Sequence, residues 1–224
     1  CTPACTTHTL QAELVMSQGL NKIGVDNIGI YPEIKAPWLF RHEGKDISKA
    51  VLTVLKEYGY TGKSDRVYLQ SFDVDELKRI NSELMPALGM DLKLVQLMAE
   101  TDWNETMVYD TKGKATPYDY DWMFKPGAMK TIAGYADGIG PWKPMIVTEP
   151  GTPGKPVFTA MVKEAHAAGL KVHPYTFRQD EGQIPPYAKD FTDLLNIFLY
   201  QVDVDGVFSD FPDKAVAVIK AHGK

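Results

Sequence analysis

Short apolar segments alternate with segments of helical periodicity along this chain, and this alternation most constrains the fold. The segments that predict strands are 28–34, 67–72, 92–97, 136–141, 171–175 and 206–209. The segments that predict helices are 10–19, 47–59, 73–88, 126–135, 156–168, 191–200 and 212–222. Strands that alternate with helices pair in parallel, because each helix carries the chain back to the same end of the sheet. The sequence therefore predicts an α/β fold with a parallel sheet.

Local signals set several boundaries. Thr9 and Asp73 are expected N-caps, because their side-chain oxygens can accept a hydrogen bond from the first turn of a helix. Gly19 and Gly59 lie near expected helix ends. Residues 36–44, between the first strand and its helix, are expected to form a loop.

About six strand-helix units with parallel strands fit either an open doubly wound sheet or a (β/α)8 barrel. No strand is followed by Gly-x-Gly-x-x-Gly, which disfavours a dinucleotide-binding sheet. Active sites of barrel enzymes lie at the C-terminal ends of the strands, and here those ends carry Glu33, Lys35, Gln70, Phe72, Gln96, His173, Tyr175, Arg178, Ser209 and Asp210. A complete barrel has eight units in about 250 residues. We expect a (β/α)8 TIM-barrel type fold, incomplete, with about six strand-helix units.

Composition places the chain among ordinary globular proteins. Its 224 residues are 44% hydrophobic and 24% charged, which fits one large domain or two small ones, and we expect one domain over 1–224. No apolar run is long enough to span a membrane. The net charge of −5 gives no long-range attraction to nucleic acid. Cys1 and Cys5 lie close together near the N-terminus and say little about the redox compartment.

Two opposite charges end the first predicted strand. Side chains alternate along a strand, so Tyr31, Glu33 and Lys35 share one face. Charged groups on an inward face are costly unless a metal, a partner or a ligand satisfies them. The pair therefore predicts a binding site, although a plain ion pair that closes a barrel layer is the alternative.

A long polar and aromatic stretch follows the third predicted strand. Residues 101–125 include Trp103, Tyr109, Tyr118, Tyr120 and Trp122. This length is unusual for a plain connection in a compact domain, so we expect a binding loop or lid.

Five motifs in this order resemble the glycerophosphodiester phosphodiesterase family, and its bacterial periplasmic branch in particular. They are Tyr-Pro-Glu-Ile-Lys at 31–35, Leu-Gln-Ser-Phe-Asp at 69–73, Tyr-Asp-Trp-Met-Phe-Lys-Pro-Gly at 120–127, His-Pro-Tyr-Thr at 173–176 and Ser-Asp-Phe-Pro-Asp at 209–213. The resemblance covers the chain from about His8 to its C-terminus. It implies a (β/α)8 barrel that hydrolyses glycerophosphodiesters to glycerol 3-phosphate and an alcohol, with a divalent cation, Ca2+ or Mg2+, in the periplasm.

The resemblance also implies roles for individual residues. Glu33 is expected to bind the metal, and Lys35 to act catalytically by contacting the phosphate. The expected substrate-binding residues are Gln70, Phe72, Trp122, Tyr175 and Arg178. The aromatic residues among them could instead be ordinary core residues, and Arg178 a solvated loop charge. Asp205 and Asp210 are expected to brace turns rather than touch substrate.

The chain departs from the family pattern in one respect. The family's first barrel strands carry His-Arg-Gly, a Glu-x-Asp pair and a second His. This sequence has no His-Arg-Gly, and its Glu-x-Asp at 100–102 follows the third predicted strand rather than the first. The chain therefore resembles the C-terminal two thirds of the family, and only His173 lies on a strand end. The alternative hypothesis is a non-catalytic remnant that binds a phosphate, a polyol or a protein partner at the rim.

An incomplete barrel would expose unpaired strand edges. Such a chain is expected to form a homo-oligomer edge to edge, to fill the gap with its N-terminal segment, or to be marginally stable.

Overall fold

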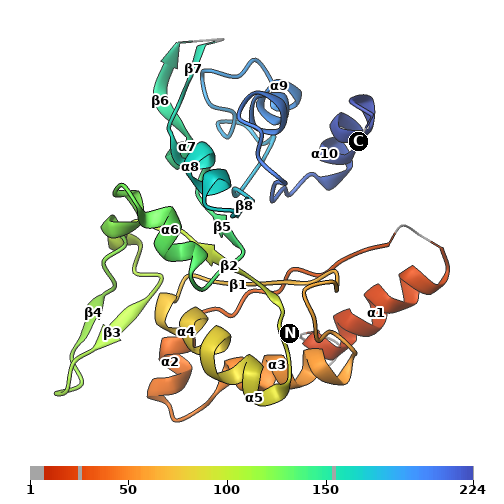
Figure 1. The fold of residues 1–224 in the computed structure, drawn as a ribbon. Helices are drawn as coiled ribbons and strands as arrows, with labels where there is room; N and C mark the ends of the chain where they lie inside the picture. Colours follow the sequence, from red (N-terminus) through yellow and green to blue (C-terminus); the bar gives the residue numbers. More distant parts are fainter. Residues whose placement is uncertain (1–7, 25–26, 153–154, 224) are drawn as a thin grey trace, which may run out of the picture. The chain divides into compact units, whose positions relative to one another are not determined.

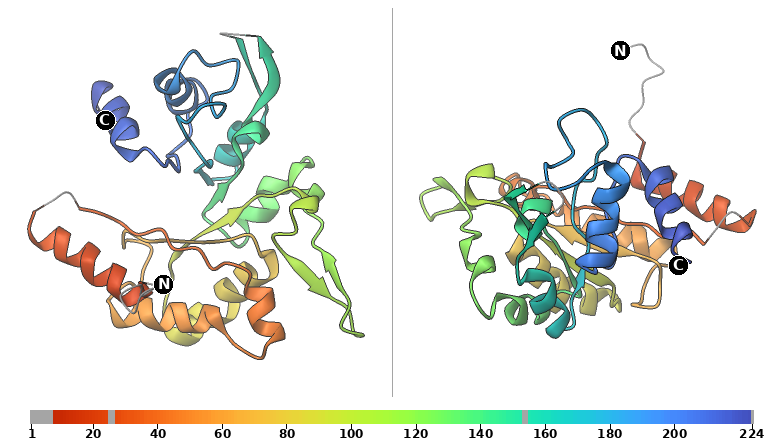
Figure 2. Two further views of the ribbon diagram at one scale, coloured as in Figure 1. Left: turned by 180° about the vertical axis from the view of Figure 1, so that it is seen from behind. Right: turned by 90° about the horizontal axis from the view of Figure 1, so that it is seen from above.

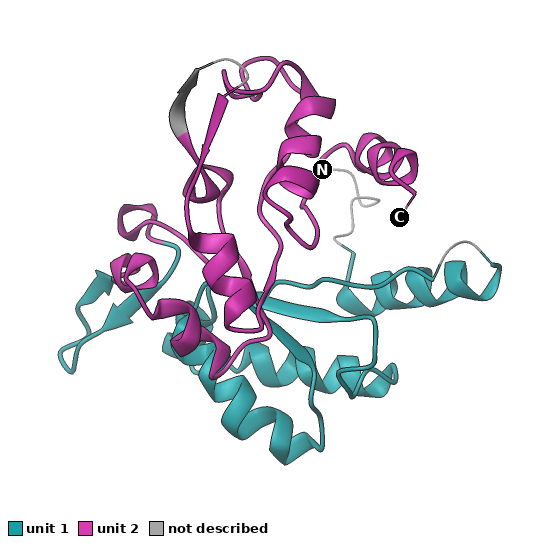
Figure 3. Ribbon diagram, turned by 45° about the horizontal axis from the view of Figure 1, so that its top comes forward, with its two compact units in different colours: residues 1–95, 105–117 teal, residues 96–104, 118–224 magenta. Residues whose placement is uncertain are grey.

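The computed structural model describes residues 8–24, 27–152 and 155–223. The chain forms two compact units (Figure 3): unit 1 comprises Cys1–Val95 and Glu105–Pro117, and unit 2 comprises Gln96–Asn104 and Tyr118–Lys224. The prediction of one barrel domain over 1–224 stays a prediction. Cys1 and Cys5 lie outside the described residues.

Unit 1 contains parallel strands. Strand β1 spans Tyr68–Ser71, and β2 spans Lys93–Leu97, with its last two residues in unit 2. The extended segment 28–34 pairs in parallel with the β1 region, where Ile30 faces Val67 and Glu33 faces Gln70. The first predicted strand therefore lies beside the second.

The helices of unit 1 cover these strands. They are α1 (Leu10–Lys22), α2 (Pro37–His42), α3 (Ile47–Glu57), α4 (Val74–Arg79), the π-helical turn η1 (Ile80–Leu84) and α5 (Met85–Leu88). Helices α3, α4 and α5 lie along one side of β1 and β2 (Figures 1 and 2). Leu52 and Leu55 of α3, Leu77 of α4 and Leu69 of β1 are fully buried, which places the core of unit 1 between these layers.

Unit 2 repeats the alternation of strands and helices. Its elements are η2 (Thr101–Trp103), η3 (Asp121–Phe124), α6 (Ala128–Ala133), β5 (Gly138–Gly140), α7 (Lys143–Ile146), β6 (Val147–Thr152), β7 (Lys155–Phe158), α8 (Met161–Ala167), β8 (Lys171–Val172), α9 (Phe191–Asn196), the π-helical turn η4 (Ile197–Gln201) and α10 (Pro212–Ala221). Strands β5 and β8 pair in parallel. Phe177 and Phe198 meet edge to face in its core, with ring centroids 4.9 Å apart.

The parallel strands follow the order β1-β2-β5-β8. Segment 28–34 continues this series beside β1, and a parallel bridge between Phe177 and Ser209 continues it after β8. All six predicted strand segments thus take part in parallel pairing, which confirms the predicted alternation.

The expected helix caps are confirmed. The Thr9 hydroxyl accepts a hydrogen bond from the Ala12 N–H at 3.2 Å. The Asp73 carboxylate accepts one from the Glu76 N–H at 2.9 Å, at the start of α4. Each cap satisfies a backbone donor that the first helical turn leaves unpaired.

Two predicted boundaries near the N-terminus were wrong. Helix α1 runs through Gly19 and ends at Lys22, because a single glycine costs only about 1 kcal/mol within a helix. The expected loop 36–44 contains helix α2. Pro37 occupies the first position of this helix, where its fixed φ favours the helix and its missing N–H costs nothing.

The predicted helix 156–168 was wrong in its first part. Lys155–Phe158 is strand β7, which pairs antiparallel with β6, and α8 begins only at Met161. Pro156 and the β-branched Val157 disfavour a continuing helix and suit an edge hairpin.

The stretch 101–125 also contains a hairpin that the sequence analysis did not predict. Strands β3 (Met107–Tyr109) and β4 (Ala115–Pro117) pair antiparallel within unit 1. Asp110 closes the turn, because its carboxylate accepts hydrogen bonds from the N–H groups of Lys112 and Lys114.

None of the helices in the described part of the chain is both long and apolar enough to cross a membrane. Pairing of copies through open strand edges stays a prediction.

Asp205 braces the turn before the last strand segment, as expected. Its carboxylate accepts hydrogen bonds from the Val172 N–H at 2.9 Å and from Lys171 Nζ at 2.7 Å, and its Oδ2 lies 2.9 Å from His166 Nε2. Burial is the largest single influence and raises the pKa of Asp205, but these bonds together outweigh it and leave the pKa below its ordinary value.

We expect Asp205→Asn to destabilise the protein by roughly 2 kcal/mol at neutral pH, since it weakens charge-assisted hydrogen bonds. The lowered pKa means that the carboxylate stabilises the fold above its unfolded pKa, and that this contribution is lost as pH falls through the folded pKa. Urea unfolding at pH 7 and near pH 3 should therefore show a difference between wild type and variant that shrinks in acid. Asp213→Asn, at an exposed position, is the control. A difference in stability between wild type and Asp205→Asn that is equal at the two pH values would contradict this account.

Candidate functional site

Three cross-strand pairs place the predicted residues of unit 1 on one face. We call this the Glu33 face, and its pairs are Tyr31 with Tyr68, Glu33 with Gln70, and Lys35 with Phe72. The two tyrosine rings stack with centroids 5.1 Å apart, and Lys35 Nζ lies 5.6 Å from the centre of the Phe72 ring. Residues paired across parallel strands point to the same side. The predicted alternation along the first strand is therefore confirmed.

The ends of the two strands fix where Lys35 lies. The Ile34 N–H donates to Gln70 O at 2.8 Å, and the Ser71 hydroxyl donates to Ile34 O at 2.8 Å. Ile34 itself is buried on the opposite face. Ala36 then takes a left-handed conformation with φ 46°, and α2 begins at Pro37. Lys35 is thus the last residue before the chain turns away.

Glu33 is a partly buried carboxylate, with 29% of its side chain exposed. Burial is the main cause that raises its pKa above the ordinary value. Lys35 opposes this shift, and the nearby carboxylate of Glu105 adds to it. A further positive charge at this place would therefore stabilise the ionised form of Glu33.

Lys35 contacts two carboxylates. Its Nζ donates to Glu105 Oε2 at 3.1 Å and lies 3.7 Å from Glu33 Oε1. Burial tends to lower the pKa of Lys35, but the two carboxylates outweigh it and leave the pKa raised. The ammonium is therefore charged at neutral pH, and 64% of the side chain is exposed, so that an anion can reach it.

Gln70 lies between these charges and the core. Its side chain is only 6% exposed, and its Oε1 has no hydrogen-bond partner among the described residues. A buried acceptor without a donor is costly. A hydroxyl group or a cation that contacts this oxygen would remove that cost.

The oxygen donors on the Glu33 face fit a divalent cation in kind but not in number. Carboxylate and amide oxygens are the hard ligands that Ca2+ and Mg2+ prefer, and Glu33 and Gln70 provide both kinds. Ca2+ takes about six to eight oxygens, however, and the described residues contain no group of three or more His, Cys, Asp or Glu arranged around a metal. The Glu33 face therefore provides part of the oxygen ligands that such a cation needs.

The other three predicted residues belong to unit 2. Trp122 Nε1 donates to the Tyr118 hydroxyl at 3.0 Å, and the Tyr175 hydroxyl donates to the Met98 carbonyl. Arg178 forms ion pairs with Asp180 at 2.8 Å and Asp210 at 3.3 Å. Each is thus held by neighbours within unit 2, whereas Gln70, Phe72, Glu33 and Lys35 lie together on unit 1.

His173 is a poor candidate for proton transfer. It is 9% exposed, and burial lowers its pKa below the ordinary value, so that it is neutral at pH 7. A Cβ at Gly206 would lie 3.2 Å from the His173 ring, which shows how closely the chain packs there. These features match a core histidine.

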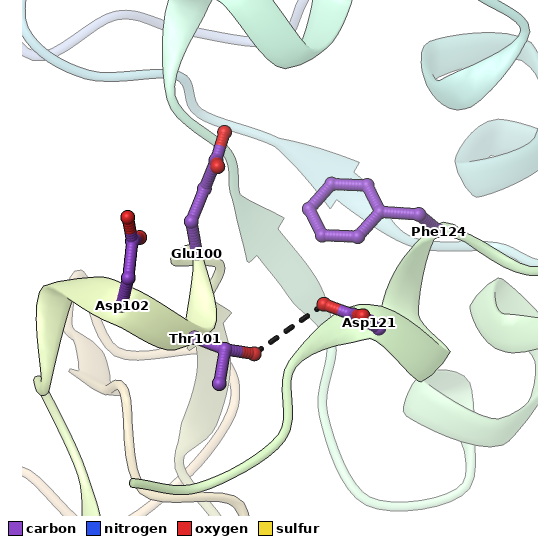
Figure 4. A pocket seen from close by; sticks show the side chains of 5 residues that line it. All are labelled: Glu100, Thr101, Asp102, Asp121 and Phe124. Carbon is purple, nitrogen blue, oxygen red and sulfur yellow. Dashed lines mark hydrogen bonds between the residues drawn. The ribbon is translucent and has the colours of Figure 1, made fainter.

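Unit 2 also contains a cavity of about 380 Å3 lined by Glu100 and by residues of the predicted binding loop. Its lining residues are Glu100, Thr101, Asp102, Asp121 and Phe124. Figure 4 shows the Thr101 hydroxyl facing Asp121, a contact of 3.3 Å, with the Phe124 ring reaching across toward Glu100. Three carboxylates disfavour a phosphate here.

Glu105 contacts Lys35 of the Glu33 face and was not among the residues predicted from the sequence. It lies within the predicted loop 101–125, just before the hairpin. No local pattern distinguished it from other acidic residues of that stretch, because its contact with Lys35 spans 70 positions.

Solved structures resemble this fold. A glycerophosphoryl diester phosphodiesterase structure from Silicibacter pomeroyi aligns with a TM-score of 0.58 at 16% identity and covers 94% of this chain and 57% of its own. An Oleispira antarctica phosphodiesterase in complex with the product sn-glycerol-3-phosphate aligns with a TM-score of 0.54 at 16% identity, over 92% of this chain and 60% of its own. Together with the parallel strand order, they confirm the predicted α/β fold of TIM-barrel type.

Two sequence relatives cover nearly all of the chain. A glycerophosphodiester phosphodiesterase of Haemophilus influenzae is 50% identical over 95% of this chain and 58% of its own length. One of Treponema pallidum is 42% identical over 96% of this chain and 60% of its own. The chain thus spans about three fifths of these relatives. The model of the glycerophosphoryl diester phosphodiesterase family matches residues 3–214, and the chain belongs to this family.

Proposed function

We propose that the protein hydrolyses glycerophosphodiesters to glycerol 3-phosphate and an alcohol with the help of a divalent cation. The observation that supports this most is the Glu33 face itself. It presents a charged lysine, a carboxylate with a raised pKa and a buried amide oxygen that has no hydrogen-bond partner among the described residues. The family and the glycerol 3-phosphate complex of the Oleispira antarctica protein support the substrate class.

Each residue of the face has a defined role in this proposal. Lys35 binds the phosphate, because its exposed ammonium carries unshared donors and a full charge. Glu33 and Gln70 supply oxygen ligands to a Ca2+ or Mg2+ ion. When bound, the cation polarises the phosphoryl group. Phe72 offers an apolar wall for the glycerol moiety.

Trp122, Tyr175 and Arg178 of unit 2 are proposed as further substrate-binding residues, on the strength of the family resemblance alone. Proton transfer is assigned to none of these residues, and the neutral, buried His173 is not an imidazolium acid at neutral pH. The resemblance to the bacterial periplasmic branch supports a periplasmic location, which cell fractionation would test.

Hydrolysis of glycerophosphocholine, followed by enzymatic detection of glycerol 3-phosphate, tests the proposed activity. We expect release of glycerol 3-phosphate when Ca2+ or Mg2+ is present, and loss of release when EDTA removes the cation. Choline and glycerol 3-phosphate should appear in equal amounts. Absence of hydrolysis with either cation would contradict the proposal.

A non-catalytic role is the second candidate. It is favoured by one observation, namely that His173, the histidine at a strand end, is buried and neutral. In that case the protein would bind a phosphate or a polyol on the Glu33 face without turnover. Saturable binding of glycerol 3-phosphate by a protein that leaves glycerophosphocholine intact would support this second function over the first.

A further inference from the structure

We propose that Glu105 is a positioning residue that holds the Lys35 ammonium beside Glu33. The significance of this contact for phosphate binding rests on the proposed function. The contact itself rests on the geometry of unit 1 alone.

Glu105 is the nearer of the two carboxylates that contact Lys35. Its Oε2 lies 3.1 Å from Lys35 Nζ and accepts a hydrogen bond, whereas Glu33 Oε1 lies at 3.7 Å. Glu105 and Glu33 are partly buried, with 27% and 29% of their side chains exposed. A lysine ammonium has three donors, so one bond to Glu105 leaves donors for a ligand. Glu105 therefore fixes the ammonium without closing it off.

The backbone of Glu105, the residue that holds Lys35, is itself anchored. The Trp38 indole N–H donates to the Glu105 carbonyl at 3.1 Å. Trp38 belongs to α2, which begins two residues after Lys35. The backbone of Glu105 is thus tied to the helix that follows the lysine it contacts.

A second contact ties the same helix to the hairpin that follows Glu105. The His42 ring of α2 stacks on the Tyr109 ring of β3, with centroids 4.2 Å apart and planes 4° apart. Trp38 also packs against Tyr109 at 6.1 Å. Isolated surface ion pairs are held loosely and contribute little. The pair between Lys35 and Glu105 should be held more firmly, because the backbones of both residues are connected to α2. Lys35 lies two residues before this helix, and the Glu105 carbonyl accepts a hydrogen bond from Trp38 within it.

Without Glu105, Lys35 keeps Glu33 as its anionic neighbour among the described residues. Its long side chain would regain rotamer freedom or move toward Glu33. Either outcome takes the ammonium from the place where Glu105 holds it. The expected consequence is weaker phosphate binding, with a larger effect on KM than on kcat.

A double-mutant cycle tests this role with glycerophosphocholine as substrate. We expect Glu105→Ala to lower kcat/KM about tenfold, mainly through KM, since it removes a charge-assisted hydrogen bond. Glu105→Gln keeps an acceptor oxygen and should recover part of the loss. In a Lys35→Ala background, Glu105→Ala should have little further effect. An equal loss in both backgrounds would overturn the inference, because Glu105 would then act other than through Lys35, for instance on a cation.

A second measurement does not depend on turnover. Relaxation of 13C-labelled lysine ε-methylene groups, with the Lys35 signal assigned by Lys35→Arg, reports how firmly the side chain is held. We expect restricted motion in the wild type and in the exposed control Glu83→Ala, and greater mobility in Glu105→Ala. Equal mobility in all three would overturn the inference. Loss of restraint in a protein without turnover would support the inference while contradicting the proposed activity.

Discussion

Glu33→Ala should lower kcat/KM for glycerophosphocholine by about 100-fold or more. Glu33 is the partly buried carboxylate of the Glu33 face, and burial raises its pKa. Partial burial of an ionised carboxylate at a strand end costs free energy of folding, because the charge loses contact with water. A bound cation would offset this cost. Its removal takes away a charged oxygen ligand and also leaves Lys35 with Glu105 as its remaining carboxylate contact. The measurement is the rate of glycerol 3-phosphate release over a range of Ca2+ and Mg2+ concentrations.

Two variants separate this effect from a loss of structure. Glu33→Gln keeps an oxygen without the charge and should lie between wild type and Glu33→Ala, with a raised cation requirement. Glu83→Ala removes an exposed carboxylate from η1 and should leave the rate unchanged. If Glu33→Ala kept a kcat/KM within threefold of wild type and a normal thermal melt, Glu33 would not be a ligand of the cation that the reaction needs.

Arg41→Ala should destabilise the protein by about 3 kcal/mol at neutral pH. Arg41 extends from α2 and forms ion pairs with Asp73, at 3.2 Å, and with Glu76. Only 2% of the Asp73 side chain and 1% of the Glu76 side chain are exposed. Arg79 remains as a partner for Glu76, at 2.8 Å. The larger cost therefore falls on Asp73, which would be left buried with less compensation.

The effect of Arg41→Ala should depend on pH in a defined direction. Burial is the main cause that raises the pKa of Asp73, and Arg41 opposes it. An acid with a raised folded pKa contributes stability that is present below its unfolded pKa and lost as pH rises through the folded pKa. Without Arg41 that loss grows. The difference between wild type and variant should therefore be larger at pH 7 than near pH 4.

Urea unfolding at both pH values measures this difference. Lys214→Ala is the matched control, because its ion pair with Asp213 is exposed on both sides, and it should change the free energy of unfolding by less than about 1 kcal/mol. An Arg41→Ala protein as stable as this control would show that the buried carboxylates do not depend on Arg41.

The sequence predicted well those features that short-range patterns determine. The alternation of apolar and polar residues placed Glu33 and Lys35 on one face, and the structure confirms it. The Asp73 cap followed from local chemistry in the same way. Motifs spread over the chain predicted the family, which the comparisons confirm.

Features that depend on distant contacts were missed or placed wrongly. Strand β7 was predicted as helix because its pairing with β6 is tertiary information that periodicity does not contain. Glu105 carried no local signal, since its importance lies in a contact with a residue 70 positions away. The Arg41 ion pairs likewise join α2 to residues 32 or more positions further along the chain.

Calorimetric titration with glycerol 3-phosphate tests most directly the central claim that the Glu33 face binds the phosphate of a glycerophosphodiester. The titration compares wild type, Lys35→Ala and the exposed control Lys214→Ala, with Ca2+ present. We expect saturable binding to the wild type and the control, weakened about 10-fold to 100-fold in Lys35→Ala through loss of a charge-assisted hydrogen bond. Equal affinity in all three proteins, or no binding to the wild type, would contradict the claim.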